Sequence, residues 1–334
     1  MPSSSVSPGN PGLREVFPLF DRYPALGKVP RVRLCDLPSP VERASIEGNA
    51  ELWIKRDDLN APACGGNKAR SLEFLLGGLE AGQSVVTIGG AGSTHVLATA
   101  MHCARIGVSV DALRWRHDMN PVARIVDQRL ASLHFGPAGR SAALALVRSG
   151  GRARRRGARF IPIGGSAPLG ILGHVNAGLE LAGQIERKEL PLPQRVVVPL
   201  ASGGTTAGLL LGLRIAGLDI EVVGVRVGPR IFVNRLTVLR LVRRTAALIA
   251  SITGERPPRV APVSLRVEHR MYGGAYGRPL TSALEAAANL QSSSGIRLDD
   301  TYSAKAWVAA IAESRQSKGP VLFWLTFDSR WLTN

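Results

Sequence analysis

The chain has 334 residues, of which 45% are hydrophobic, and its formal net charge is +17. Single hydrophobic cores stop growing at roughly 250–300 residues, so this length predicts an enzyme-sized protein of two domains. No apolar run approaches the roughly 20 residues that cross a membrane, and the Ser/Pro-rich start lacks the basic-then-apolar pattern of a signal peptide. We therefore expect a soluble, cytoplasmic protein with no membrane contact.

The basic residues are the feature most suggestive of a nucleic-acid partner. Six arginines crowd between Arg148 and Arg159. Aromatic residues are not interleaved with them except for Phe160 at the end, and no recognised nucleic-acid module is visible. We interpret the cluster as a solvated helix end or loop and expect no nucleic-acid partner. The odd number of cysteines and their spacing indicate neither a disulfide framework nor a metal site.

Strand and helix patterns alternate along the chain. Residues 52–55 alternate like a short strand, and leucines recur at helical spacing from Leu72 to Leu79. Further strands are predicted at 84–88, 108–115, 160–163, 195–199, 220–227, 263–267 and 321–325. Helices are predicted at 94–105, 121–133, 172–185 and 205–216. This alternation is typical of an α/β protein whose parallel sheet is covered by helices on both faces.

The segment from Cys64 to Arg70 places a lysine behind a glycine pair at the start of a predicted helix. Lys68 falls in the first helical turn, where the positive end of the helix dipole disfavours the ammonium form. This position suits an amine that must be neutral to condense with an aldehyde, as in a Schiff base with pyridoxal phosphate. The other interpretation of so short a motif is a solvated lysine in a loop.

A second glycine-rich segment, residues 201–208, lies between a predicted strand and a predicted helix. Its glycines allow backbone amides to approach an anion, its hydroxyls add donors, and the helix N-terminus adds partial positive charge. A phosphate is the expected occupant, and a plain strand-to-helix turn is the alternative. The segment lacks the Gly-Lys-Ser/Thr end of a nucleotide P-loop and the Gly-x-Ser-x-Gly setting of a hydrolase nucleophile.

Six motifs occur together and in order over about residues 34–326. They are Lys-Arg-Asp-Asp-Leu at 55–59, Gly-Gly-Asn-Lys-x-Arg at 65–70, Ser-x-His at 93–95, Ile-Pro-x-Gly-Gly-Ser at 161–166, Ser-Gly-Gly-Thr at 202–205 and Tyr-x-x-Lys at 302–305. As a set they resemble the pyridoxal-phosphate enzymes of the ACC (1-aminocyclopropane-1-carboxylate) deaminase and D-cysteine desulfhydrase family. The resemblance implies fold type II, in which two α/β domains are built on open, twisted parallel sheets and the cofactor lies in the cleft.

The resemblance also implies a domain division and a set of partners. Residues 1–82 and 180–334 would form the large cofactor-binding domain, and residues 83–179 the small one. The cofactor would be pyridoxal 5'-phosphate without a metal, the substrate a small amino acid, and the assembly a homodimer.

The family's cofactor-binding residues match two segments of this chain. Lys68 matches the lysine that forms the Schiff base and then acts as the base at the substrate α-carbon, and Asn67 lies beside it near the cofactor. The loop that holds the cofactor phosphate is matched by Ser202, Gly203, Gly204, Thr205 and Thr206.

A further group is implied to face the substrate. Ser93 and His95, with Thr94 between them, match the turn that receives the substrate carboxylate at a helix N-terminus. Tyr276 and Tyr302 match two active-site tyrosines, and a phenol near the α-carbon can assist proton transfer. If the family match is ignored, core packing with a satisfied hydroxyl explains each tyrosine equally well.

Ser303 distinguishes between the family's two reactions. It falls where ACC deaminases place a glutamate against the pyridine nitrogen of the cofactor and desulfhydrase-like members place a threonine. A carboxylate keeps that nitrogen protonated and makes the ring a deep electron sink, whereas a hydroxyl does not. We therefore predict β-elimination from D-cysteine or a similar β-substituted amino acid to give an α-keto acid and ammonia, with ACC deamination as the alternative.

Departures from the family pattern leave other functions open. Thr94 stands in place of an asparagine, Ala304 in place of a glycine, and residues 323–328 lack a histidine and two glycines of the common pattern. A divergent homologue with weak activity, or one that binds an amino acid or the cofactor without turnover, is the second hypothesis. A nucleic-acid binder is the third.

Overall fold

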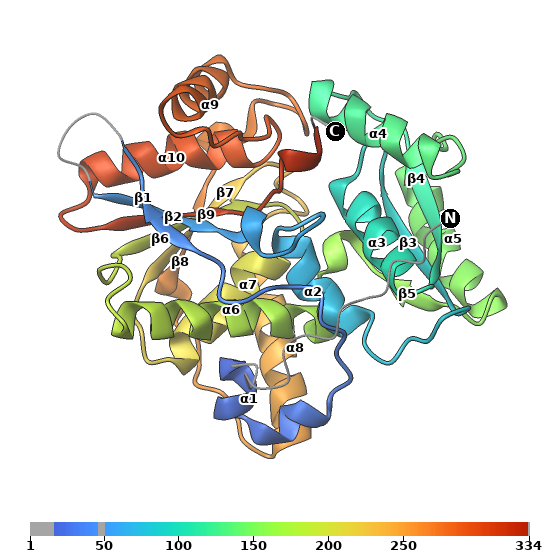
Figure 1. Cartoon of the computed structure of the whole chain (residues 1–334), viewed down its shortest axis with the longest axis horizontal. Coiled ribbons are helices and arrows are strands. Elements are labelled where there is room, and N and C mark those ends of the chain that lie inside the picture. The colour runs from blue at the N-terminus through green and yellow to red at the C-terminus, as the bar shows by residue number, and fades with distance from the viewer. Residues whose placement is uncertain (1–16, 46–50, 333–334) are drawn as a thin grey trace, which may run out of the picture.

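The computed structural model describes residues 17–45 and 51–332, and it contains two sheets that lie in separate lobes (Figure 1). The larger sheet has six strands in the order β1-β2-β9-β6-β7-β8. These strands are β1 (Val41–Arg43), β2 (Leu52–Arg56), β9 (Val321–Leu325), β6 (Arg195–Leu200), β7 (Glu221–Arg226) and β8 (Leu265–Glu268). β1 pairs with β2 in antiparallel fashion, and the other described pairs of this sheet are parallel.

The smaller sheet has three parallel strands in the order β4-β3-β5. Its strands are β3 (Ser84–Gly90), β4 (Ser109–Trp115) and β5 (Arg159–Ile161), and its helices are α3 (Thr94–Arg105), α4 (Pro121–Ser132) and α5 (Ala142–Arg155). A polar side chain caps the start of each helix by accepting a backbone N–H three residues on, namely Ser93, Asn120 and Ser141. These caps fix where the helices begin.

Helices cover both faces of the larger sheet (Figure 1). One face carries α6 (Pro168–Glu186), α7 (Gly204–Ile215) and α8 (Arg235–Thr253), and the other carries α9 (Thr281–Ser294) and α10 (Ser303–Gln316). Val196 and Val198 of β6 belong to the first core, whereas Val197 belongs to the second. A parallel strand buried on both faces needs apolar residues on both, which explains the unbroken apolar run in β6. None of the described helices is long and apolar enough to cross a membrane.

The helix α2 (Asn67–Leu75) lies where the two lobes meet. It packs against α6 of the larger lobe and against α3 of the smaller one. The short helix α1 (Pro18–Arg22) also packs against α6. Because α2 carries Lys68, the junction of the lobes determines the position of that lysine.

The α/β class and the parallel sheets are confirmed, and most predicted elements are observed within a few residues. The helix at 94–105 and the strand at 321–325 have the predicted bounds. The helix predicted at 172–185 starts earlier, because Pro168 is favoured at the first position of α6. The edge strand β1 and the helices α1, α5, α8, α9 and α10 were not predicted.

The arginine cluster runs from the middle of α5 to its C-cap residue Arg156, and its last member, Arg159, lies in β5. Arg152 and Arg156 both contact the carboxylate of Asp111 in β4. The interpretation of a helix end is therefore confirmed, and part of the cluster is held by an ion pair rather than solvated alone.

The packing of α6 bears on the expected domain division. Residues 168–179 were assigned to the small domain, yet α6 packs most extensively against α7 and also against α2. The division at residues 83 and 180 stays a prediction, and the position of α6 favours a second boundary before Pro168.

Candidate active site

Gly66 allows the helix that carries Lys68 to begin against the end of β9. Its φ of +104° favours glycine, and a Cβ there would lie 2.4 Å from the carbonyl oxygen of Thr326. The backbone N–H of Asn67 donates to that same oxygen at 3.0 Å, and the N–H of Gly66 donates to Asn60 Oδ1 at 2.9 Å. These contacts fix the start of α2 and put Lys68 in its first turn, as predicted.

The side chain of Lys68 is partly buried, and the groups that contact or face its amine in the described part of the chain are neutral. Its Nζ donates to the Gly164 carbonyl oxygen at 3.3 Å, and burial lowers the pKa of Lys68 to about 8. Burial, followed by the charge of Lys68, lowers the pKa of His95 to about 3 and that of His174 well below its ordinary value. The lysine therefore has neutral imidazoles as neighbours. His174, within an apolar helix, was not predicted.

The loop before α7 forms a cradle suited to an anion. Gly203 has a φ of +87° and lies at the N-cap of α7, so the first N–H groups of that helix are directed out of its end. Asn67 Nδ2 donates to Thr205 Oγ1 at 2.8 Å, which ties the loop to α2. The hydroxyl of Thr206 is buried and has no hydrogen-bond partner within the described chain. A phosphate oxygen would supply one.

The turn at residues 163–166 packs against the cradle. Ser166 Oγ donates to Ser202 Oγ at 2.7 Å. A Cβ on Gly204 would lie 2.6 Å from Ser166 Oγ, and one on Gly164 would lie 2.2 Å from Ser202 Oγ. Both glycines are needed for this close approach. Since the Gly164 carbonyl also contacts Lys68, the turn connects the amine to the cradle.

A buried ionic network anchors α2 behind Lys68. Arg70 contacts Asp57 at 2.7 Å and Glu180 at 2.8 Å, and Lys55 contacts Glu180 at 2.6 Å. Burial alone would raise the pKa of Glu180, but Arg70 and Lys55 lower it to about 2, so the carboxylate stays ionised. The network joins α2 to α6 and to the end of β2.

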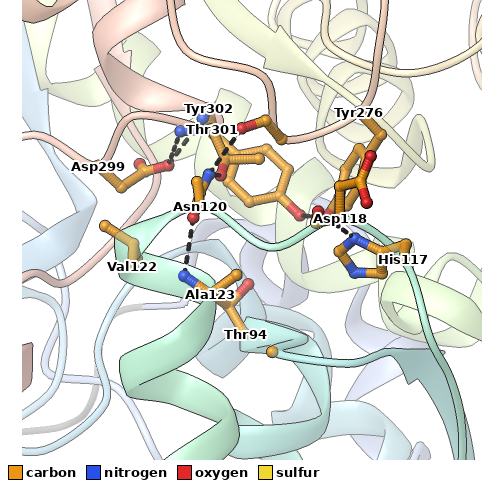
Figure 2. Close-up of a pocket in the computed structure, with 12 residues that line it drawn as sticks. Thr94, His117, Asp118, Asn120, Val122, Ala123, Tyr276, Asp299, Thr301 and Tyr302 are labelled. Carbon is orange, nitrogen blue, oxygen red and sulfur yellow. Dashed lines mark hydrogen bonds between the residues drawn. The ribbon is translucent and has the colours of Figure 1, made fainter. Parts of the chain in front are cut away.

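Tyr276 and Tyr302 meet in a small pocket between the lobes (Figure 2). Their hydroxyls hydrogen-bond to each other, and their rings meet edge to face with centroids 6.2 Å apart. Burial is the main cause that raises both pKa values, that of Tyr302 well above its ordinary range, so both phenols are protonated at neutral pH. Thr94, His117 and Asn120 also line this pocket. The last two were not predicted.

The turn at residues 93–95 is divided between two environments. Ser93 Oγ accepts the Val96 N–H at 3.4 Å as the cap of α3. Thr94 faces the tyrosine pocket. The ring of His95 is buried, with Nε2 3.0 Å from Thr87 Oγ1 of β3. Of the three residues expected to receive a substrate carboxylate, only Thr94 lines this pocket, and the roles of all three stay predictions.

Ser303 begins α10 as a fully buried residue. Its backbone N–H donates to Asp299 Oδ2 at 3.0 Å, and the same carboxylate accepts the N–H groups of Thr301 and Tyr302. The Ser303 hydroxyl is buried and forms no hydrogen bond of good geometry in the part of the chain that the structure describes, although it lies close enough to the Asp299 carboxylate to lower the pKa of that group. A buried hydroxyl in this state is an available donor or acceptor.

Residues 323–328, which depart from the common family pattern, form hydrogen bonds with the segment that precedes Lys68. Trp324 Nε1 donates to Asp57 Oδ2 at 2.8 Å. Asp328 Oδ2 accepts the N–H of Gly65 at 3.0 Å. The residues that replace the common family pattern thus hold the loop just before Lys68.

These residues fit pyridoxal phosphate. Lys68 offers an amine that is partly neutral near pH 8, and the 202–206 cradle offers a helix N-terminus and the unpartnered Thr206 hydroxyl for a phosphate. The buried hydroxyl of Ser303 could meet a ring nitrogen. The fold and this donor set define an enzyme that depends on pyridoxal phosphate.

A comparison with protein families agrees with this dependence on pyridoxal phosphate. The chain belongs to the family described as "Pyridoxal-phosphate dependent enzyme", whose model matches residues 32–326. The predicted cofactor and the predicted enzyme class are confirmed.

The chain is also similar to individual members of this family. The chain is 36% identical over 325 residues to a nocardicin C-9' epimerase from Nocardia uniformis subsp. tsuyamanensis, covering 91% of this chain and 94% of the relative. It is 31% identical over 321 residues to a D-cysteine desulfhydrase from Salmonella newport, covering 89% and 94%. The crystal structure of an ACC deaminase homologue superposes with a TM-score of 0.73 and 28% identity, covering 93% of this chain and 94% of that one. The resemblance to the ACC deaminase and D-cysteine desulfhydrase family is confirmed.

Proposed function

We propose that the protein catalyses β-elimination from a small amino acid with a leaving group on its β-carbon, with D-cysteine as the first candidate. The observation that carries this proposal is that the residue at the start of α10 is a serine with a fully buried, neutral hydroxyl rather than a carboxylate. Two carboxylates precede Ser303 closely along the chain. The oxygens of Asp299 accept three backbone N–H groups, and burial, followed by the charge of Asp299, raises the pKa of Asp300 to about 6, which disfavours its charged form. A neutral hydroxyl would leave the nitrogen largely unprotonated, which favours prompt loss of a β-substituent.

The chain's own groups suit the proton transfers of such an elimination. When bound, the cofactor withdraws electrons from the substrate α-carbon. Lys68, with its pKa near 8, would accept the α-proton as the Cα–H bond breaks. One phenol of the Tyr276 and Tyr302 pair would donate a proton to the sulfur as the Cβ–S bond breaks. Hydrolysis of the released product by water would then give pyruvate and ammonia.

A second candidate is inversion at the α-carbon. The 36% identical relative is named an epimerase, and the paired tyrosines could return a proton where Lys68 removed one. Both candidates begin with loss of the α-proton, so they differ in whether the β-substituent then leaves. ACC deamination is a third candidate, and a divergent homologue with weak or absent turnover is a fourth.

A substrate screen with two readouts separates these candidates. The purified holoenzyme is incubated in D2O with D- and L-cysteine, D-serine, 2,3-diaminopropionate and ACC, while α-keto acid and α-deuteration are followed, with Lys68→Ala as the control. We expect α-keto acid from a β-substituted substrate at least roughly tenfold faster than from ACC, a difference of about 1.4 kcal/mol in barrier. Deuteration or inversion without keto acid would replace the proposal with epimerisation, and comparable opening of ACC would replace it with deamination.

The assembly and location expected from the sequence are also proposals. A homodimer should elute at twice the monomer mass in size-exclusion chromatography with light scattering. A cytoplasmic protein should fractionate with the soluble cell contents. A monomer, or recovery with membranes, would contradict these expectations.

A further inference from the structure

Asn120 connects the small lobe to both tyrosine-bearing segments of the large lobe (Figure 2). Its Oδ1 accepts the Ala123 N–H at 2.8 Å and so caps α4. Its Nδ2 donates to the Gly277 carbonyl oxygen at 2.9 Å and to Thr301 Oγ1 at 2.5 Å. The residue is 7% exposed, so these bonds lie away from competing water. The side-chain amide of Asn120 therefore forms hydrogen bonds in both lobes.

The two acceptors lie one residue from the two tyrosines. Gly277 follows Tyr276, and Thr301 precedes Tyr302, whose hydroxyls are hydrogen-bonded to each other. Gly277 also has a φ of +76° in the connection between β8 and α9. Such a connection lies outside the sheet ladders, so its position depends on side-chain contacts of this kind.

We propose that Asn120 is a positioning residue that makes the pairing of Tyr276 with Tyr302 depend on the approach of the small lobe. When α4 lies against the large lobe, the amide holds both tyrosine-bearing segments at once. When it moves away, both bonds break together and the phenols lose their fixed separation. The catalytic consequence rests on the proposed function, whereas the structural coupling does not.

The two roles of Asn120 can be separated by substitution. Asn120→Asp keeps a side-chain oxygen for the α4 cap, and aspartate is as good an N-cap as asparagine. It lacks the Nδ2 donor, and its carboxylate cannot bond to the Gly277 carbonyl. Asn120→Ser also keeps a capping oxygen without adding charge. The matched control is Asn234→Asp at the partly buried N-cap of α8, where Asn234 Oδ1 accepts the Thr237 N–H at 3.0 Å.

The decisive experiment measures amide hydrogen exchange of the holoenzyme without substrate, in peptides that cover residues 272–279 and 299–303. Both Asn120 variants should exchange at least roughly tenfold faster than wild type in these peptides, while Asn234→Asp should match wild type. With a turned-over substrate, kcat should fall at least roughly tenfold, and KM and cofactor content should change less than about threefold. Thr301→Ser keeps the hydroxyl that accepts from Asn120, so its exchange rates and kcat should match wild type. Thr301→Val lacks that hydroxyl, so it should exchange faster in these peptides and have a lower kcat.

Exchange rates in both Asn120 variants within about twofold of wild type would overturn the proposal. Loss of cofactor together with faster exchange throughout the protein would overturn it as well, because that result assigns Asn120 a general structural role. The exchange measurement needs no turnover, so failure of the proposed function would leave this test intact.

Discussion

The side-chain amide of Asn67 donates to the hydroxyl of Thr205 at 2.8 Å. This bond joins the first turn of α2 to the first turn of α7, so the helix that presents Lys68 and the helix that starts at the anion cradle keep a fixed relation. An amine and an anion site held together in this way match one ligand that carries both an aldehyde and a phosphate. Each part of this site can be tested by substitution or titration.

The cradle can be tested at Gly204. Gly204→Val should reduce bound cofactor at least roughly tenfold, because a Cβ there would lie 2.6 Å from Ser166 Oγ and its methyl groups would fill the anion's place. Cofactor content is measured by absorbance after gel filtration. The control is Gly150→Val, where a Cβ meets nothing within 4 Å. Full cofactor occupancy in Gly204→Val would place the phosphate elsewhere.

Ser303 can be tested by two substitutions that differ in charge. Ser303→Ala removes a hydroxyl that forms no hydrogen bond of good geometry in the described chain, and the nearby Asp299 carboxylate keeps its three backbone donors, so stability should change by less than about 1 kcal/mol and β-elimination should persist. Ser303→Glu should protonate the ring nitrogen and slow keto-acid formation relative to α-deuteration by roughly tenfold or more. An unchanged ratio in Ser303→Glu would show that this position does not control the reaction.

The lowered pKa of Lys68 predicts how cofactor capture depends on pH. Its folded value is about 8, below the ordinary 10.5, so the neutral amine is dominant above pH 8 and becomes scarce as the pH falls. After removal of the cofactor, its rate of covalent capture by the apoprotein should rise about tenfold per pH unit below pH 8 and level off above it. Stopped-flow absorbance gives this profile. A rate that continued to rise to pH 10 would mean that Lys68 has an ordinary pKa.

Removal of one charge from the buried ionic network should destabilise the folded protein. Glu180→Gln leaves Arg70 and Lys55 with too little negative charge, and it should lower the free energy of unfolding by about 3–5 kcal/mol. Because the folded pKa of Glu180 is about 2, below its ordinary 4.5, this contribution is present above pH 4.5 and is lost as the pH falls through 2.

An exposed ion pair provides the control for this measurement. Glu255 pairs with Arg22, and the two side chains are 50% and 43% exposed. Glu255→Gln should therefore lower the free energy of unfolding far less than Glu180→Gln does in the same urea titration, because water screens an exposed pair. Equal costs for Glu180→Gln and Glu255→Gln would mean that the buried network does not anchor α2.

The sequence was informative where structure is set by local patterns. An apolar stripe between the Ser93 cap and Gly107 was enough to give the bounds of α3. The glycine pair before Lys68 was enough to place the lysine in the first turn of α2. In contrast, α9 is rich in alanine and serine, and α10 has no side chain at its N-cap residue that caps it. Local patterns are weak in both, and both helices were missed.

Contacts between distant segments could not be predicted from those patterns. The sequence presents Asn120 only as the residue before a predicted helix, although its amide reaches acceptors 157 and 181 positions away. The motif around His95 indicates a substrate-binding turn, whereas the ring contacts Thr87 in β3. The direction of a side chain depends on tertiary packing, which a single sequence does not specify.

The assignment of Lys68 as the residue that binds the cofactor is the one on which the rest of the site depends most. Borohydride reduction of the holoenzyme, followed by proteolysis and mass spectrometry, identifies the lysine that carries the reduced pyridoxyl group. We predict that the group is found on Lys68, and that Lys68→Ala abolishes both the label and the visible absorbance of the bound cofactor. A label on Lys55 or Lys305 would contradict the assignment of the site.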